Sequence, residues 1–460
     1  MRLKVHPILD PGFKPLSVIM RDFGAQVAAS ESQEIAIAIV RNHGFTSTYR
    51  MRVFKDFTGH DTENAYLVER VVKTLLWIKG GYKIVIAGSK PLYEHVKAAY
   101  AAGGGRAFDF DFMAGVFERP FEVDYVADVK DAPQTRETAS AIGRHLNGCR
   151  IGFDAGGSDR KVSAVIDGEA VYSEEVIWHP KTQTDPQYHF DGILDAMRTA
   201  ASKMPRVDGI GVSSAGIYID NRAMVASLFL GVPKTEENLQ KIRNIYIDVA
   251  KALGDVPIEV ANDGDVTALA GAMDLGDDGV LGVAMGTSEA GGYVDMAGNI
   301  TGWLNELAFV PVDANPDAMA DEWSGDRGCG VKYFSQDAVI KLAPAAGIEL
   351  PAELTLAEKL KYVQALQEQG DPRARGIYET IGVYFGYALA YYAMFYDIKH
   401  VLIMGRVTSG TGGTLLLAKA QEVLDVEFPE LAQKIRLNIP DEHSRRVGQS
   451  VAAASLPYIG

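Results

Sequence analysis

The sequence has little cysteine and no long apolar run. Its 460 residues include only two cysteines, Cys149 and Cys329, which lie far apart and form no CxxC pair. A disulfide scaffold is therefore excluded, and a reducing, cytoplasmic setting is expected. The longest apolar stretches, such as Ile35–Val40 and Val401–Met404, have the length of a strand, whereas a membrane span needs about 20 residues. No apolar segment follows the first residues, so we expect no signal peptide.

Basic residues are also in short supply. The chain carries 45 Lys and Arg against 60 Asp and Glu, which gives a net charge of −15 and a pI of about 5.1. Because contacts to phosphate backbones and anionic lipids need clustered Lys and Arg, we expect no nucleic-acid partner and no membrane partner. The length and the 47% hydrophobic content indicate about three domain-sized units.

Residues 1–147 are predicted to form a first α/β unit. Helical patterns over 63–79 and 91–102 flank a strand-like segment at 83–88, and a further helix is predicted over 131–147. Acidic and basic residues nearly balance in this unit and no basic recognition helix is visible, so DNA binding is not expected. The sequence leaves three roles open for this unit: it closes over an active site, contributes to a dimer, or binds a second ligand.

From Cys149 onward, strands and helices alternate, and several strands end in small or acidic polar residues. This order is typical of α/β folds. Strands are predicted over 150–154, 162–166, 169–176, 209–213, 258–260, 280–285 and 400–404. Helices are predicted over 191–203, 236–253, 266–273, 356–369, 377–396, 414–424 and 446–455.

The first of these strand ends has the residue types that a phosphate site needs. Asp154 opens the run Asp-Ala-Gly-Gly-Ser in a predicted tight turn, and Lys161 follows shortly after it. Gly156 and Gly157 allow backbone N–H groups to approach an anion, and Ser158 and Lys161 are within reach of phosphate oxygens. Asp154 is a suitable ligand for hydrated Mg²⁺, which takes few carboxylates.

Two later strand ends extend this pattern. Gly286, Thr287 and Ser288 form a hydroxyl-bearing glycine turn, which suits a second part of a polyphosphate. Gly405 and Arg406 open a glycine-containing loop before a helix, an arrangement that suits a nucleoside. For each loop alone, a plain strand-to-loop turn is an equal alternative, so the order and spacing of the loops carry the prediction.

Seven segments between residues 149 and 460 form an ordered series of motifs. They lie at 154–158, 209–216, 260–271, 280–292, 304–309, 325–335 and 446–454. In this order they resemble DxGGT, IGIxxxG, ENDANAAALGE, VxLGTGxGGG, AGELGH, CGxxGCxExYxS and GAAxLA, the motifs of the ROK (repressor, open reading frame, kinase) family of sugar kinases.

The resemblance implies a two-lobed actin/hexokinase-like (ribonuclease H-like) α/β fold behind the separate N-terminal unit. The small lobe would comprise residues 148–261 and the terminal helix at 444–460, and the large lobe residues 262–443. The implied activity is ATP- and Mg-dependent phosphorylation of a hydroxyl on a hexose or related sugar, a phosphotransferase reaction with an alcohol group as acceptor. We also expect a homodimer.

The resemblance also implies roles for particular residues. Asp263 would be the catalytic base that accepts the proton of the attacking sugar hydroxyl. Asn262 and Glu306 would bind the sugar, and Asp265 adds a further carboxylate near the site. The alternative for Asn262 and Asp263 is that they simply cap the following helix. His179, His189 and Trp303 are further candidates for lining a sugar pocket, against the alternative of ordinary packing.

The sequence departs from the family pattern at the zinc site. The family uses one His and three Cys, but Phe309, Glu322 and Ser324 occupy three of these positions and only Cys329 remains. One thiolate cannot make a four-ligand structural site, so no zinc is expected.

Two further departures affect the nucleotide loops. Glu289 follows the second phosphate loop and would repel phosphates unless its side chain points away. Arg406 stands where the family has a second glycine, so that it would stack on a base, bind phosphate or block the site. These departures leave two alternatives open: a non-catalytic sugar- or nucleotide-sensing protein, and an ATPase or phosphotransferase with a non-sugar acceptor.

Overall fold

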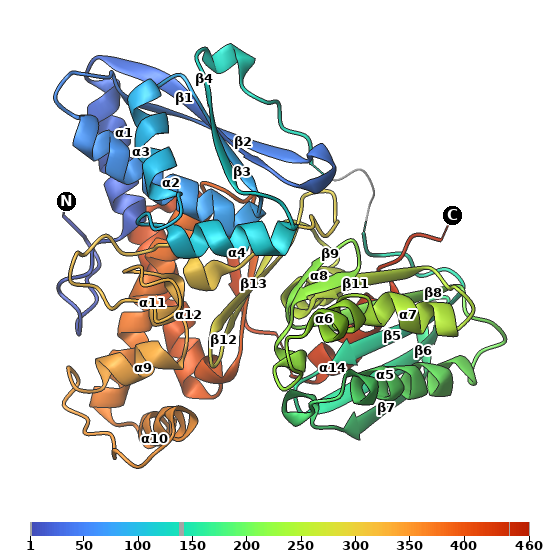
Figure 1. The fold of residues 1–460 in the computed structure, drawn as a ribbon. Helices are drawn as coiled ribbons and strands as arrows, with labels where there is room; N and C mark the ends of the chain where they lie inside the picture. Colours follow the sequence, from blue (N-terminus) through green and yellow to red (C-terminus); the bar gives the residue numbers. More distant parts are fainter. Residues whose placement is uncertain (1, 138–141, 441, 460) are drawn as a thin grey trace. The chain divides into compact units, whose positions relative to one another are not determined.

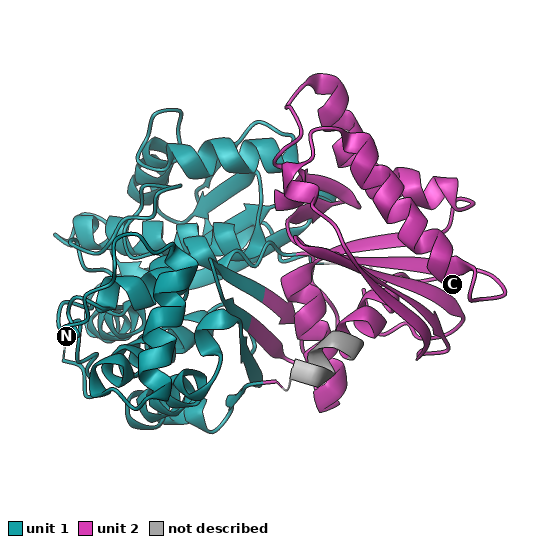
Figure 2. Cartoon of the chain, turned by 90° about the horizontal axis from the view of Figure 1, so that it is seen from below, with its two compact units in different colours: residues 1–137, 283–291, 303–439 teal, residues 138–282, 292–302, 440–460 magenta. Residues whose placement is uncertain are grey.

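The computed structural model describes residues 2–137, 142–440 and 442–459, without the side chains of 442–447. The chain divides into two compact units (Figure 2). Unit 1 contains residues 1–137, 283–291 and 303–439, and unit 2 contains residues 138–282, 292–302 and 440–460. None of the helices in the described residues has both the length and the apolar character that a bilayer crossing requires.

The N-terminal part of unit 1 is an α/β layer. Its sheet has the strand order β2-β1-β3-β4, in which β1 is antiparallel to both of its neighbours and β3 is parallel to β4. The strands are β1 (Ser32–Val40), β2 (Thr46–Phe54), β3 (Lys83–Ala87) and β4 (Glu122–Val126). The helices are α1 (Leu16–Ala28), α2 (Asp61–Lys79), α3 (Lys90–Ala99) and α4 (Ala107–Phe117). The strand at 83–88 and the two flanking helices are therefore confirmed.

The rest of unit 1 is built on a second sheet and a group of helices. The sheet has the order β13-β12-β14-β15, with β12 (Val280–Met285), β13 (Glu289–Val294), β14 (His400–Met404) and β15 (Arg436–Asn438); residues 280–282 of β12 and 292–294 of β13 are assigned to unit 2. The helices are α9 (Gln336–Leu342), α10 (Leu356–Glu368), α11 (Pro372–Tyr392), α12 (Thr411–Glu427) and α13 (Pro429–Ala432). Helices α11 and α12 pack against each other (Figure 1).

The first residues of the chain are hydrogen-bonded to α11, although the sequence pattern predicted a separate N-terminal unit. The Tyr387 hydroxyl donates to the carbonyl oxygen of Val5 at 2.9 Å, and the Tyr384 hydroxyl donates to Asp10 at 2.5 Å. Tyrosine hydroxyls that lie on a buried helix need partners, and the first residues supply them. Residues 1–137 and 303–439 consequently belong to one compact unit.

Unit 2 is built on one sheet with the order β11-β8-β5-β6-β7. The strands β5 (Cys149–Ala155), β8 (Gly209–Ser214) and β11 (Ile258–Asn262) are mutually parallel, and β6 (Asp159–Ile166) and β7 (Glu169–Ile177) continue from β5 as an antiparallel meander. A short pair, β9 (Ile217–Ile219) and β10 (Arg222–Val225), follows β8 in sequence. The three strands predicted over 150–154, 162–166 and 169–176 are confirmed. The helices are α5 (Pro186–Ala201), α6 (Glu236–Arg243), α7 (Ile245–Ala252), α8 (Asp263–Leu275) and α14 (Glu442–Ala454).

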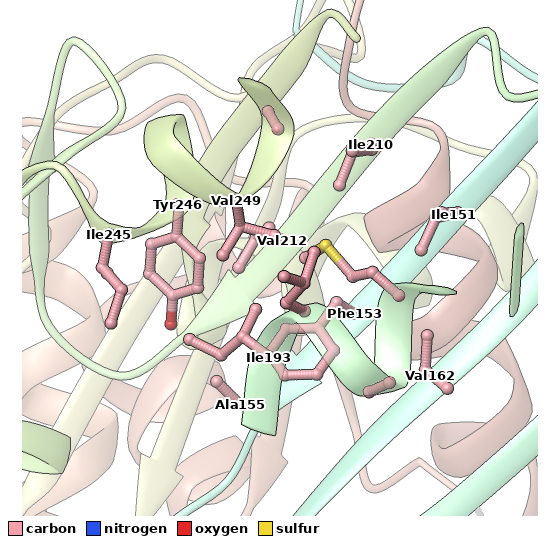
Figure 3. Packing of buried hydrophobic residues seen from close by; sticks show 14 of the residues in the cluster. Ile151, Phe153, Ala155, Val162, Ile193, Ile210, Val212, Ile245, Tyr246 and Val249 are labelled. Atoms are coloured by element: carbon pink, nitrogen blue, oxygen red, sulfur yellow. The ribbon is translucent and has the colours of Figure 1, made fainter. Parts of the chain in front are cut away.

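The core of unit 2 lies between this sheet and helices α5 and α7. Phe153 and Val212 project from neighbouring strands and meet Ile193 of α5 and Val249 of α7 (Figure 3). All four side chains are fully buried, and burying each of them contributes roughly 1.5–3 kcal/mol. This packing fixes the strands whose carboxyl ends carry the candidate site residues.

Glycines in two central strands let helix α14 approach the sheet closely. A Cβ atom on Gly211 of β8 would collide with the backbone of Ala453, and one on Gly152 of β5 would collide with the backbone of Ser450. Any larger residue at these positions would push the helix away. The terminal helix α14 is therefore packed directly on β5 and β8.

Two helix predictions were wrong. No helix is found over 132–137 or 142–147, and residues 138–141 lie outside the described residues. Pro133 disfavours a helical residue before it, and Gly143 has φ of 104°, which a right-handed helix does not accept. The single helix predicted over 236–253 is two helices, α6 and α7, because the chain leaves helical geometry at Asn244.

Candidate functional site

Asp154 and Asp263 lie at the carboxyl ends of strands in the sheet of unit 2. Asp154 is the penultimate residue of β5, and Asp263 begins α8 directly after β11. The strand between them is β8, whose Ser213 pairs in register with Asp154. The Ser213 hydroxyl donates to Asp154 Oδ1 at 3.1 Å. In open α/β sheets this edge is where ligands bind.

Burial sets the electrostatics of the two carboxyl groups. It raises the pKa of Asp154 to about 6, with Lys161 acting against the rise and the charge of Asp263 adding to it. Burial also raises the pKa of Asp263, although the backbone N–H of Gly264 donates to its Oδ1 at 3.0 Å. A bound cation would relieve the cost of ionising both groups, so Asp154 fits the Mg²⁺ ligand that the sequence predicted.

The loop after Asp154 is held in place by the end of β7. The Trp178 indole N–H donates to the carbonyl oxygen of Gly156 at 2.7 Å, and the backbone N–H of Trp178 donates to that of Ser158 at 3.1 Å. Both polar side chains predicted to bind phosphate contact the Asp159 carboxylate instead. The Ser158 hydroxyl donates to Asp159 Oδ2 at 3.0 Å, and the Lys161 ammonium forms an ion pair with Asp159 Oδ1 at 3.2 Å. An anion would compete with Asp159 for them.

Lys181 is a site residue that the sequence pattern did not reveal. Its Nζ lies 3.1 Å from the position that a Cβ atom on Gly157 would occupy. The phosphate-type loop therefore has two lysines near it, Lys161 and Lys181. No spacing rule points to Lys181, because the turn after β7 brings it back to the loop. Ser213 was also missed, although its place at a strand end was a usable signal.

Asn262 and Asp265 are both engaged in holding α8. The Asn262 side chain caps the helix by accepting from the backbone N–H of Gly264 at 2.8 Å, and its Nδ2 donates to the carbonyl oxygen of Gly216 at 2.7 Å. Asp265 is buried and accepts from the backbone N–H of Tyr293 at 3.0 Å. These bonds fix the start of the helix that carries Asp263, and the substrate contacts of the two residues stay a prediction.

In unit 1, the ends of β12 and β14 bring the second phosphate loop and the nucleoside loop together. Gly405 has φ of 100°, and a Cβ atom on it would collide with the backbone of Met285, which directly precedes Gly286, Thr287 and Ser288. Only glycine allows this approach. Arg406 is exposed, and its carbonyl oxygen accepts from Gln364 Nε2 at 2.6 Å. Whether Arg406 binds a ligand or blocks the site stays a prediction.

Glu289 points into the protein and away from the phosphate loop that it follows. Only 2% of the residue is exposed, and its Oε1 accepts from the Tyr392 hydroxyl at 3.3 Å. Burial raises the pKa of Glu289 to about 8, and the charge of Glu306 adds to the rise. At neutral pH the side chain is therefore mostly uncharged and does not repel a phosphate at the neighbouring loop.

Glu306 is half-buried and belongs to a loop that is bonded to α2. Its backbone N–H donates to the carbonyl oxygen of Trp77 at 3.0 Å. Of the other sugar-pocket candidates, Trp303 lies on the same loop, and His179 is exposed in unit 2. His189 is fully buried, with Nε2 2.9 Å from the carbonyl oxygen of Pro180, so the packing alternative holds for it.

The residues at the family's zinc positions all make contacts of their own. Phe309 stacks on Trp77 with ring centroids 4.2 Å apart, Glu322 pairs with Lys332, and the Ser324 hydroxyl donates to Asp321 at 2.6 Å. Both cysteines are free and buried, and the Cys329 thiol donates to Asp326 at 3.8 Å. That no zinc is bound stays a prediction.

Comparison with known proteins gives the fold. No protein-family model and no curated protein sequence matches this chain. Among solved structures, a ROK hexokinase from Thermus thermophilus matches with a TM-score of 0.51 and 18% identity, over 66% of this chain and 97% of the hexokinase. The chain has the ROK-type fold over two-thirds of its length. The predicted actin/hexokinase-like fold class is thereby confirmed.

The ROK-type fold is shared by proteins with different activities. A ROK family transcriptional regulator, a homologue of the E. coli MLC protein, matches with a TM-score of 0.50 and 17% identity, over 68% of this chain and 79% of the regulator. The fold therefore includes sugar kinases and regulators, and the particular residues of this chain must distinguish between them.

Proposed function

We propose that this chain transfers the γ-phosphoryl group of ATP, in the presence of Mg²⁺, to a hydroxyl of a hexose or a related sugar. The observation that carries the proposal is the pair Asp154 and Asp263, two partly buried carboxyl groups at the carboxyl ends of parallel strands, whose pKa values are both raised by burial. One carboxylate would hold the cation and the other would act as the base. Phosphoryl transfer needs little further covalent help than this, because positioning and charge neutralisation supply most of the rate.

Asp263 is proposed as the general base. Burial raises its pKa, which makes the carboxylate a stronger proton acceptor than an exposed aspartate. The hydrogen bonds of Asn262 and Asp265 fix the first turn of α8, so the carboxyl group is held by a rigid element. A sugar hydroxyl 2.6–3.2 Å from Asp263 would lose its proton to the carboxylate as its oxygen attacks the γ-phosphorus.

Asp154 is proposed to hold the Mg²⁺, which when bound neutralises charge on the phosphates. The glycine turn at 156–157, together with Ser158, Lys161 and Lys181, would bind phosphate oxygens. The loop Gly286-Thr287-Ser288 of unit 1 and the adjoining Gly405 and Arg406 are also proposed to bind nucleotide.

Glu306 is proposed to bind hydroxyls of the acceptor. A carboxylate accepts hydrogen bonds from neighbouring sugar hydroxyls, and Glu306 is only half-buried, so that it remains accessible to a ligand. We also propose that the protein acts as a homodimer, which light scattering on the purified chain would test.

The experiment is ADP release with Mg-ATP across a panel of hexoses, amino sugars, polyols and non-sugar alcohols, beside a sample without acceptor. Turnover that depends on a sugar supports the proposal. Turnover that is independent of any acceptor would identify an ATPase, and turnover only with a non-sugar alcohol would identify a different phosphotransferase.

A second candidate is a non-catalytic sugar- or nucleotide-sensing protein. The observation that favours it is that both ends of the Asn262 amide are already bonded within the chain, to Gly264 and Gly216. A sensor would show ligand-dependent thermal stabilisation by a sugar or nucleotide without any turnover.

A further inference from the structure

The loop that carries Glu306 is attached to the last turn of α2, in the N-terminal layer of unit 1. The backbone N–H of Asn305 donates to the carbonyl oxygen of Ile78, and that of Glu306 donates to the carbonyl oxygen of Trp77, both at 3.0 Å. The last carbonyl groups of a helix have no partner within the helix. The Glu306 loop thus supplies two of the partners that the end of α2 requires.

Lys79, the last residue of α2, contacts a residue of the same loop. Its ammonium is 2.9 Å from the ring centroid of Trp303, and it donates to the carbonyl oxygen of Phe395 at 3.4 Å. Only 7% of Lys79 is exposed. A desolvated ammonium over an indole face makes one of the stronger cation–π contacts, so Lys79 holds Trp303 in place.

The indole N–H of Trp303 is also hydrogen-bonded to the N-terminal layer. Its indole N–H donates to Glu137 Oε2 at 2.9 Å, and Glu137 is itself fixed by the Ser47 hydroxyl at 2.6 Å and by an ion pair with Arg41. Trp303 is therefore clamped between an ammonium and a carboxylate, both from residues 1–137.

Asn305 holds the middle of the loop in an uncommon conformation. Its φ is 52°, in the left-handed region, and its Oδ1 accepts from the Tyr396 hydroxyl at 2.9 Å. A left-handed residue persists only where its surroundings determine it. Trp303 and Glu306 are therefore part of one short loop, with Asn305 between them, and both residues contact α2: Trp303 through Lys79 and Glu306 through Trp77.

We propose that Lys79 is a positioning residue for the acceptor, acting through Trp303 on the Glu306 loop, so that residues 1–137 form part of the acceptor site. The inference rests on the proposed function, since the acceptor role of Glu306 is itself proposed. The N-terminal layer then has a defined role, because it supports the loop whose carboxylate selects the sugar.

The cation–π contact between Lys79 and Trp303 should depend on pH. Burial lowers the pKa of Lys79 to about 7; Glu137 and Asp397 favour its charged form and Arg41 disfavours it. As the pH rises through this value the ammonium loses its proton, and the cation–π contact with Trp303 is lost. The KM for the acceptor should therefore be lower at pH 6 than at pH 8.

The kinetic test compares Lys79→Met with Lys79→Arg and with the control Lys97→Met. Lys97 also lies over an aromatic ring, that of Tyr93 at 5.3 Å, but it is exposed. Lys79→Met should raise the acceptor KM about tenfold without changing kcat or the KM for ATP, and should remove the pH dependence of the acceptor KM. Lys79→Arg should restore most of the affinity, and Lys97→Met should behave as wild type. A fall in kcat at unchanged acceptor KM would overturn the proposal.

A second measurement does not require enzyme activity, and it separates the positioning role of Lys79 from the proposed kinase function. Amide hydrogen exchange over 303–309 should accelerate in Lys79→Met and in Trp303→Phe, which keeps a ring but loses the bond to Glu137, and should stay unchanged in Lys97→Met. Unchanged exchange in both loop variants would refute the positioning role even if wild type is an active kinase. The opposite combination is also informative. If exchange accelerates in these variants but the wild-type chain phosphorylates no acceptor, the positioning role of Lys79 is supported and the proposed function is refuted.

Discussion

Asp154 and Asp263 lie at the ends of two parallel strands of one sheet, and the negative charge of Asp263 adds to the burial that raises the pKa of Asp154. The strand between them contributes Ser213, whose hydroxyl bonds to Asp154. Two carboxyl groups in this relation are costly to the folded chain unless a cation or a proton neutralises them. Such a cost is expected where the groups serve a ligand rather than stability.

Asp154→Asn should greatly raise the Mg²⁺ concentration needed for half-maximal activity. The amide keeps the shape of the side chain but removes the charge that would hold the cation. In wild type the same loss should occur as the pH falls through about 6, because Asp154 then takes up a proton. Magnesium titrations at pH 5.5, 6.5 and 7.5 would measure both effects. Asp195→Asn, which changes an exposed aspartate of α5, is the control; an equal effect there would contradict the assignment.

Glu289→Gln should remove one pH-dependent contribution to stability. The folded chain holds the Glu289 proton up to about pH 8, whereas the unfolded chain releases it near pH 4.5. Between these values Glu289 alone should lower the free energy of unfolding as the pH rises, by about 1.4 kcal/mol per pH unit, in addition to the contributions of other titrating groups. Urea unfolding at pH 5, 6, 7 and 8 would measure this slope. The decline should be less steep in the variant than in wild type by this contribution, and the exposed change Glu353→Gln should leave the slope of wild type unchanged.

Lys73→Met should destabilise unit 1 by about 3–5 kcal/mol. Lys73 is fully buried and pairs with Asp109 at 3.1 Å, so its removal leaves the buried Asp109 carboxylate without its ammonium partner, whereas Asp326 keeps its ion pairs with Arg70 and Arg106. The double change Lys73→Met with Asp109→Leu should recover part of the loss, because a buried pair replaced by apolar residues is nearly neutral. Thermal unfolding would follow both. A loss no larger than that of Lys241→Met, which breaks an exposed pair, would contradict the prediction.

The strand-end residues could be predicted because the carboxyl ends of parallel strands share one edge of a sheet. That rule placed Asp154 and Asp263 on the sheet edge of unit 2, and Gly286 and Gly405 at the ends of neighbouring strands in unit 1. Lys181 escaped prediction because only the path of the turn after β7 returns it to the glycine loop.

Other features depend on contacts that are distant in sequence. Whether Glu289 faces inward is decided by Tyr392 and Gly330, which contact its carboxyl group from segments far along the chain. The hairpin of β1 and β2 was not predicted, because the connection at 41–45 has no turn signal as strong as Asn-Gly, although Thr46–Phe54 contains polar and apolar residues in the mixture expected of a strand. The link between α2 and Glu306 is likewise made only by tertiary contact.

The most direct measurement is ADP release with Mg-ATP and the best acceptor, for wild type beside Asp263→Asn, with ATP binding measured in parallel. We predict acceptor-dependent turnover in wild type, a loss of about 10²–10⁴-fold in kcat in the variant, and ATP binding that is unchanged. Turnover in Asp263→Asn equal to that of wild type would contradict the assignment of the base. Failure of the wild-type chain both to bind ATP and to phosphorylate any acceptor would contradict the kinase itself.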